Sequence, residues 1–153
     1  MKALELKIPP PLLALLFAAG MWMLSTLPPL LQVPTFIRMF VAAAIAFVGV
    51  AISFAGVFSF RCAKTTVNPM KPRNASSLVT TGVYQVTRNP MYLGLLLVLI
   101  GWAVYLSSVW ALVGVVAFVY YIERFQIKPE EQALDALFSA EYSAYKTQVR
   151  RWL

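Results

Sequence analysis

Two short polar segments flank a long apolar stretch and hold most of the side chains that could do chemistry. The first is Thr87-Arg88-Asn89-Pro90-Met91-Tyr92-Leu93-Gly94, and the second is Ile127-Lys128-Pro129-Glu130-Glu131. An arginine can hold an anion through paired hydrogen bonds, a tyrosine ring can face a cation, and a carboxylate can accept a hydrogen bond or a proton. Neighbouring side chains on a helix diverge by about 100°, so Glu130 and Glu131 are expected to have separate roles.

Each segment also has a purely structural interpretation. Arg88 suits the positively charged edge of a membrane, Pro90 suits the first turn of a helix, and Tyr92 suits an interfacial aromatic belt. The paired glutamates would interact favourably with the dipole at a helix N-terminus. Gly94 and Gly101 lie on one helical face and indicate close helix packing, which can also leave a crevice for a ligand.

The composition is that of an integral membrane protein. Hydrophobic residues make up 60% of the 153-residue chain, charged residues make up 12%, and the mean hydropathy is +0.72. There is room for roughly four spans of about 20 residues, and none for a separate soluble nucleotide-binding domain. The chain has no histidine and one cysteine, Cys62. This excludes a disulfide framework, a Cys/His zinc site and a histidine base, and no metal is expected.

The apolar runs predict four membrane helices. We expect a first helix at about 11–27 and a second at 39–60. As a single helix, the stretch Asn89–Ile122 would reach about 51 Å, far beyond a hydrocarbon core of about 30 Å. We therefore expect it to fold back at Ser107-Ser108 into a short helical hairpin, with about 16 residues in each helix.

Four crossings with both termini in the cytoplasm divide the basic residues unequally. Only Arg38 falls outside, and the cytoplasmic side receives Lys2, Lys7, Arg61, Lys64, Lys71, Arg73, Arg88, Arg124, Lys128, Lys146, Arg150 and Arg151. The positive-inside rule requires such a bias. The net charge of +7 is therefore interpreted as a topology signal, and no nucleic-acid partner is expected.

Two cytoplasmic segments remain, a loop at about 61–88 and a tail at about 123–153. Prolines and Gly82 argue against a continuous helix in the loop. The tail is predicted to form an amphipathic helix that begins near Pro129 and lies either on the membrane or over the loop. Its apolar residues recur at helical spacing: Leu134, Leu137, Phe138, Tyr142, Tyr145, Val149 and Trp152.

Taken in order, these segments resemble the isoprenylcysteine carboxyl methyltransferase and phospholipid methyltransferase superfamily. The resemblance rests on Gly82-x-Tyr84-x-x-x-Arg88-Asn89-Pro90-Met91-Tyr92-Leu93-Gly94 and, after the hairpin, on Pro129-Glu130-Glu131-x-x-Leu134 followed by Phe138, Glu141, Tyr142 and Tyr145. It covers about residues 60–153. It implies that S-adenosyl-L-methionine binds between the two segments at the cytoplasmic membrane face, and that a lipophilic substrate arrives from the bilayer.

The resemblance also implies roles for particular residues. One of Glu130, Glu131 or Glu141 would have to act as the base if the acceptor is a protonated amine, whereas a carboxylate or thiolate acceptor needs none. Arg150, together with Arg151, is a candidate for orienting an anionic acceptor, although both also suit a membrane surface. Cofactor binding is expected from Tyr84, Arg88, Asn89, Pro90, Tyr92, Gly94, Glu130 and Glu131.

Two departures limit what the resemblance implies. Asn89 stands where the eukaryotic prenylcysteine enzymes have histidine, which argues against a prenylcysteine substrate. Ser139 stands where the tail motif commonly has glycine, which indicates a local variation in a turn. Two other classes stay open: an NADPH-dependent membrane reductase of the sterol-reductase type, and a non-catalytic membrane or lipid-binding module.

The sequence thus predicts one all-α polytopic domain over residues 1–153, with two spans at 1–60 and a cofactor-binding core at 61–153. It is expected in a bacterial inner membrane, where it would transfer a methyl group to a small lipophilic or lipid-linked acceptor. The expected entry route is a lateral gap between the hairpin at 91–122 and the second span, lined by Gly94 and Gly101.

Overall fold

The computed structural model describes residues 5–28, 31–63 and 77–153. Every regular element within these ranges is a helix, so the all-α prediction is confirmed for this part of the chain. The predicted cytoplasmic positions of Lys2, Lys64, Lys71 and Arg73 lie outside the described residues.

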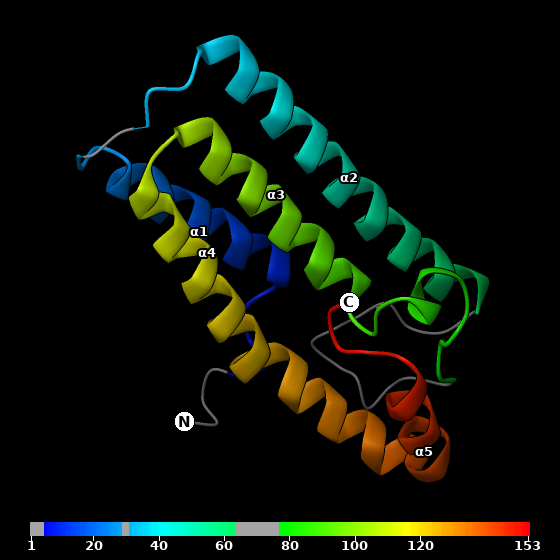
Figure 1. Ribbon diagram of the computed structural model, residues 1–153. Helices are drawn as coiled ribbons and strands as arrows, with labels where there is room; N and C mark the ends of the chain where they lie inside the picture. The colour runs from blue at the N-terminus through cyan, green and yellow to red at the C-terminus, as the bar shows by residue number, and fades with distance from the viewer. Residues whose placement is uncertain (1–4, 29–30, 64–76) are drawn as a thin grey trace.

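Four apolar helices alternate in direction through the molecule (Figure 1). They are α1 (Pro10–Leu24), α2 (Thr35–Cys62), α3 (Pro90–Leu106) and α4 (Val109–Ile122). α2 packs along α3, and α1 packs against α4 and α3. The starts of α1 and α3 and the ends of α2 and α4 share one end of the bundle, which we call the polar end. The opposite end, with the linker 31–34 and the α3–α4 turn, is called the turn end.

The first two helices occur where they were expected, with different boundaries. α1 ends at Leu24, a few residues before the predicted end, and α2 is longer than predicted at both ends. α2 is about 42 Å long, whereas α1, α3 and α4 are each about 21–26 Å long. α2 and the helical stretch Val109–Gln148, which comprises α4 and the two helical elements after it, are long and apolar enough to cross a membrane, and α1 and α3 are apolar but shorter.

The fold-back predicted at Ser107-Ser108 is confirmed. Ser107 has a left-handed backbone conformation, with φ of 53°, and it ends α3. Its hydroxyl donates to the Leu31 carbonyl at 2.8 Å, and its carbonyl accepts from the Leu31 amide at 2.8 Å. These two hydrogen bonds fasten the hairpin turn to the linker that precedes α2.

Small residues bring α2 and α3 into close contact. A Cβ atom at Gly94 would collide with Gly49 and Ser53 of α2, and one at Gly101 would lie 2.8 Å from the Ala42 carbonyl oxygen. The packing role predicted for the two α3 glycines is therefore confirmed. The predicted lateral gap at these glycines is wrong, because the backbone approach that they permit closes this interface.

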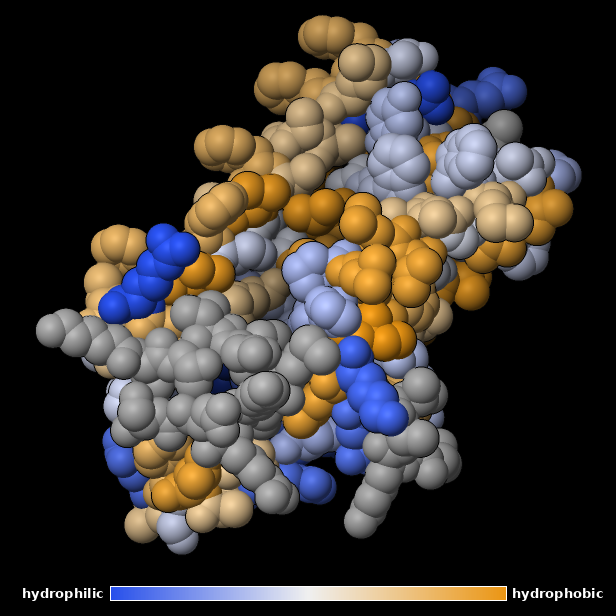
Figure 2. Space-filling model, turned by 180° about the vertical axis from the view of Figure 1, so that it is seen from behind, coloured by the Kyte–Doolittle hydropathy of each residue, from blue (hydrophilic) through white to orange (hydrophobic). Residues whose placement is uncertain are grey.

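Large apolar side chains cover the outside of the helices. Phe36, Phe47 and Phe54 of α2 are 80%, 75% and 70% exposed. Hydrophobic surface runs across the middle of the face shown in Figure 2, and the most hydrophilic residues gather toward its ends. Exposed apolar surface on this scale is typical of contact with lipid, and it agrees with the prediction of a membrane protein.

α4 continues into the tail through a π-helical turn. This turn, η4 (Glu123–Ile127), leads directly into α5 (Lys128–Gln148). π turns are often found at functional sites. Within η4, Gln126 is buried and donates from Nε2 to the Ile8 carbonyl at 2.8 Å, which fastens the segment before α1 to the polar end. Pro129 lies in the first turn of α5, as predicted.

α5 is broken, and the single tail helix that was predicted is wrong at this point. Ser139 has φ of 35° and ψ of −100°, a positive-φ conformation that favours glycine. Glycine is also the residue that the tail motif commonly has there. Beyond the break, Tyr142, Tyr145 and Val149 pack with Leu78. This half of α5 therefore lies over the loop, which was one of its two predicted placements.

Candidate functional site

The starts of α3 and α5 meet at the polar end. The Tyr92 hydroxyl donates to Glu130 Oε2 at 2.8 Å, so one hydrogen bond joins the two polar segments. Tyr92 is 3% exposed and Glu130 is half-buried. Most of the pair is therefore shielded from water.

The Glu130 carboxyl is suited to exchange a proton near neutral pH. Burial is the largest influence and raises its pKa from 4.5 to about 7, while the hydrogen bond from Tyr92 lowers it and the charge of Glu131 raises it. Burial has this effect because it disfavours the charged form of a carboxyl. Both protonation states are populated at pH 7, as a general acid or base requires.

Glu131 points away from this pair and into a network of charges. It lies 3.1 Å from Arg88 Nη2 and accepts hydrogen bonds from Arg151 Nη2 at 2.7 Å and Arg151 Nε at 3.1 Å. Arg151 also donates from Nη1 to Glu123 at 2.7 Å. The two neighbouring carboxylates therefore have different partners, in agreement with their expected divergence.

Arg88 has one donor that its neighbours do not satisfy. Its Nε is buried and has no hydrogen-bond partner among the residues that the structure describes. A buried donor without an acceptor costs about 1–3 kcal/mol. The position therefore favours an acceptor that a ligand supplies.

The C-terminal residues are fastened across the first polar segment. The Arg88 amide donates to the Arg150 carbonyl at 3.0 Å. The Thr87 hydroxyl and Asn89 Nδ2 donate to the Arg151 carbonyl at 3.2 and 3.0 Å. The side-chain amide of Asn89 is thus engaged with the backbone of the tail. The Arg150 side chain is exposed, whereas the Arg151 side chain turns inward to two glutamates.

Glu123 was not among the predicted site residues, and Arg151 was predicted only as a candidate, together with Arg150, for orienting an anionic acceptor. Two adjacent arginines carry no signal that tells which one faces inward. Glu123 belongs to the π turn η4, and no motif in the sequence marks that turn.

Tyrosines form apolar walls beside the carboxylates. Tyr84, in the 3-10 turn η3 (Gly82–Gln85), is 5% exposed, and its ring meets that of Phe60 edge-on, with 5.4 Å between centroids. Burial, followed by the nearby Glu130 and Tyr145, raises the pKa of its hydroxyl. The Tyr145 hydroxyl donates to the Tyr84 carbonyl at 2.6 Å. This contact fixes η3 against α5 and keeps the Tyr84 ring in place.

Two further predicted site residues lie in the contact between α2 and α3. Pro90 is buried in the first turn of α3 and faces Gly56 of α2. Gly94 faces Ser53 of α2. Both residues therefore seat α3 on α2, and in this way they set the position from which Tyr92 reaches α5.

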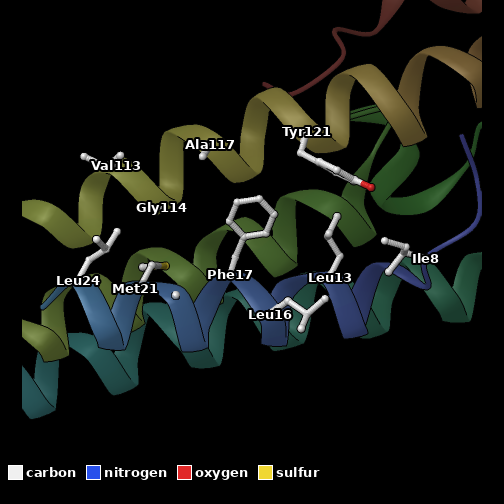
Figure 3. A pocket seen from close by; sticks show the side chains of 11 residues that line it. Ile8, Leu13, Leu16, Phe17, Met21, Leu24, Val113, Gly114, Ala117 and Tyr121 are labelled. Carbon is white, nitrogen blue, oxygen red and sulfur yellow. The ribbon is translucent and has the colours of Figure 1, made fainter. Parts of the chain in front are cut away.

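A separate apolar groove of about 490 Å³ lies between α1 and α4 (Figure 3). Phe17 and Met21 point from α1 toward α4, and Tyr121 reaches from α4 toward α1. The groove extends from Leu24, near the turn end, to Ile8, near the polar end. Its apolar lining suits a hydrocarbon chain that lies parallel to the helices.

Comparison with known proteins covers both polar segments. A model of the phospholipid methyltransferase family matches residues 37–141, which include Arg88, Tyr92 and the paired glutamates. An uncharacterized protein of Haemophilus influenzae is 48% identical over 63 residues, which are 41% of this chain and the whole of that protein. No solved structure matches the chain. The expected superfamily is confirmed: the chain belongs to the phospholipid methyltransferase family, which indicates a membrane methyltransferase.

Proposed function

We propose that the chain transfers a methyl group from S-adenosyl-L-methionine to a small lipophilic or lipid-linked acceptor at the cytoplasmic face of a bacterial inner membrane. Membership of the family supports methyl transfer. The observation that carries the site is the 2.8 Å hydrogen bond between Tyr92 and Glu130. It joins the two polar segments at the end of the bundle where Arg88 Nε is without a described partner.

The side chains of the polar end fit the chemical groups of this cofactor. Arg88 Nε suits a carboxylate, the rings of Tyr84 and Tyr92 suit a sulfonium or an adenine, and Glu130 suits an ammonium group or ribose hydroxyls. When bound, the cofactor supplies a methyl group on a positively charged sulfur. The task of the protein residues is then to align the acceptor and exclude water, which such a displacement mainly requires.

Glu130 is the proposed acceptor for a proton that leaves the methyl acceptor. With a pKa of about 7, its carboxylate can take the proton of an ammonium acceptor while Tyr92 holds it in position. A carboxylate or thiolate acceptor brings no such proton, and Glu130 then serves only as a hydrogen-bond acceptor. Arg150 stays a candidate for contact with the acceptor headgroup, because its side chain is exposed beside the polar end.

The groove between α1 and α4 supports entry of the acceptor from the bilayer. Ile8 lies at the polar end of the groove, and its carbonyl accepts the hydrogen bond from Gln126 of η4. The same turn carries Glu123 of the charge network. A hydrocarbon chain in the groove would therefore hold its headgroup near the polar end, and this route replaces the gap that the sequence predicted.

We further propose four membrane crossings with both termini in the cytoplasm. The helices alternate in direction, and Arg38 lies at the turn end (Figure 1). The positive-inside rule then assigns the polar end to the cytoplasm, and short helices such as α1 and α4 cross by thinning the bilayer locally. The described basic residues of the polar end are Lys7, Arg61, Arg88, Arg124, Lys128, Lys146, Arg150 and Arg151.

Calorimetric titration of the purified chain in detergent with S-adenosylhomocysteine tests this function, with NADPH as the comparison. Arg88→Ala and Glu130→Ala should each weaken S-adenosylhomocysteine binding by about 1.5–3 kcal/mol, because each would remove a hydrogen bond to a charged group. Glu141→Gln changes an exposed carboxyl on α5 and should leave the affinity unchanged.

Three results would contradict the proposal. Binding of NADPH alone would indicate a reductase instead of a methyltransferase. Binding of neither compound, in a sample whose circular dichroism shows the expected helix content, would favour a non-catalytic membrane module. Unchanged affinity for S-adenosylhomocysteine in both folded variants would mean that Arg88 and Glu130 do not bind the cofactor and have only structural roles.

A further inference from the structure

Arg38, at the turn end, forms no ion pair with the acidic side chains that the structure describes. The sequence contains six acidic residues. Glu5 precedes α1 and the other five follow α4, so that all six belong to the polar end (Figure 1). None of these six side chains is therefore placed to neutralise Arg38.

The Arg38 side chain is held within the structure instead of extending into solvent. It is half-buried, and its guanidinium carbon lies 5.9 Å from the centroid of the Tyr105 ring. Its Nε is buried and has no hydrogen-bond partner in the described part of the chain. Because an unsatisfied buried donor is unfavourable, this position lacks an acceptor.

The Ser108 hydroxyl is a second polar group without a hydrogen-bond partner in the described structure, and it also lies at the turn end. Its side-chain oxygen is buried without a described partner, and the residue is only 3% exposed. Ser108 is the N-cap residue of α4, yet its hydroxyl makes no cap hydrogen bond. The N-terminus of α4 therefore adds backbone amides and the positive end of a helix dipole, which together favour an anion.

Arg38 and Ser108 line one pocket of about 290 Å³. The rest of its lining is mostly apolar and includes Ile37 and Val41 of α2 and Leu112 of α4. Tyr105 and Trp110 lie at this end of the bundle and are both 42% exposed, as is typical of aromatic residues at a membrane interface. An occupant that suits the pocket has an anionic head and a hydrocarbon chain.

We propose that this pocket at the turn end binds an anionic phospholipid, whose phosphate accepts hydrogen bonds from Arg38 Nε and the Ser108 hydroxyl. Its acyl chain lies against the apolar wall. A zwitterionic lipid fits less well, because the turn end has no carboxylate to receive its ammonium group. The site lies at the opposite end of the bundle from Glu130 and does not depend on the proposed methyl transfer.

Native mass spectrometry of the full chain in neutral detergent tests the site, with dioleoylphosphatidylglycerol and dioleoylphosphatidylcholine as probes. We expect phosphatidylglycerol to be retained about tenfold more strongly, which corresponds to 1.4 kcal/mol. Arg38→Gln should remove most of this preference. Arg61→Gln, at an exposed arginine of the polar end, is the matched control and should keep it. Ser108→Ala tests the same pocket by a smaller change and should weaken phosphatidylglycerol retention by about threefold.

Several outcomes would overturn the site. One is equal retention of the two lipids by the unaltered chain. Another is a similar loss of preference in Arg38→Gln and Arg61→Gln, which would mean that general positive charge attracts the lipid. A third is displacement of phosphatidylglycerol by excess inorganic phosphate, which would identify a soluble anion as the ligand. If Arg38→Gln lacks the expected helix content, an undiminished preference in Ser108→Ala would also decide against the proposal.

Discussion

Glu130 and Glu131 are adjacent in the chain and have opposite environments. Glu131 is held by the guanidinium groups of Arg88 and Arg151, whereas the side-chain partner of Glu130 is the hydroxyl of Tyr92. Burial favours the neutral form of a carboxyl and raises the pKa of Glu130. Two adjacent residues of α5 therefore have different roles: Glu131 pairs with arginines, and Glu130 is the candidate for proton exchange.

The raised pKa of Glu130 makes stability depend on pH. Because the folded chain holds this proton more tightly than the unfolded chain, the contribution is complete below about pH 4.5 and is lost as the pH rises through about 7. A shift of this size corresponds to roughly 3 kcal/mol. The Tm advantage of the unaltered chain over Glu130→Gln should therefore shrink between about pH 5 and pH 8. A constant difference, measured by circular dichroism with Glu141→Gln as control, would contradict the raised pKa.

At the scale of elements, the helices could be predicted because each is an apolar run with a recognisable boundary. Pro34 precedes α2, and the length of the uncharged stretch after Asn89 required the hairpin. The π turn η4 could not be predicted, because no motif in the sequence marks it. The position of Ser139 indicated a turn, but not that α5 breaks there and that Tyr145 then contacts the Tyr84 carbonyl. The spacing of Gly94 and Gly101 predicted that another helix packs closely against α3, but it did not predict that this helix is α2.

The strained residue in α5 leads to a prediction for this element. A non-glycine residue at the backbone angles of Ser139 stores about 1–3 kcal/mol, and glycine avoids this cost at some loss of unfolded-state entropy. Ser139→Gly should therefore raise the free energy of unfolding by about 1 kcal/mol. Ser143→Gly, at an exposed helical position of α5, should lower it by up to about 1 kcal/mol. If both variants lose stability in thermal unfolding, Ser139 is not strained.

The two ends of the bundle differ in whether their arginines have carboxylate partners. At the polar end, Arg151 returns from the end of the chain to bridge Glu123 and Glu131, and the tail backbone pairs with residues 87–89. At the turn end, Arg38 is without a carboxylate. The meeting of the two polar segments could be predicted from their shared position at one membrane face. The inward turn of Arg151 could not, because it depends on the course of the tail after α5.

The Arg151 side chain should therefore help to hold the C-terminal tail at the polar end, and the Arg150 side chain should not. Arg151→Ala removes the described ion pair of Glu123 and one of the two guanidinium groups on Glu131, all in partly buried surroundings. We expect a loss of about 1–3 kcal/mol in unfolding free energy, and faster removal of the tail by carboxypeptidase. Arg150→Ala should stay within about 0.5 kcal/mol, because its side chain is exposed. Thermal unfolding and mass spectrometry of the digests measure both effects. Equal behaviour of the two variants would mean that the backbone hydrogen bonds to residues 87–89 hold the tail without help from the charge network.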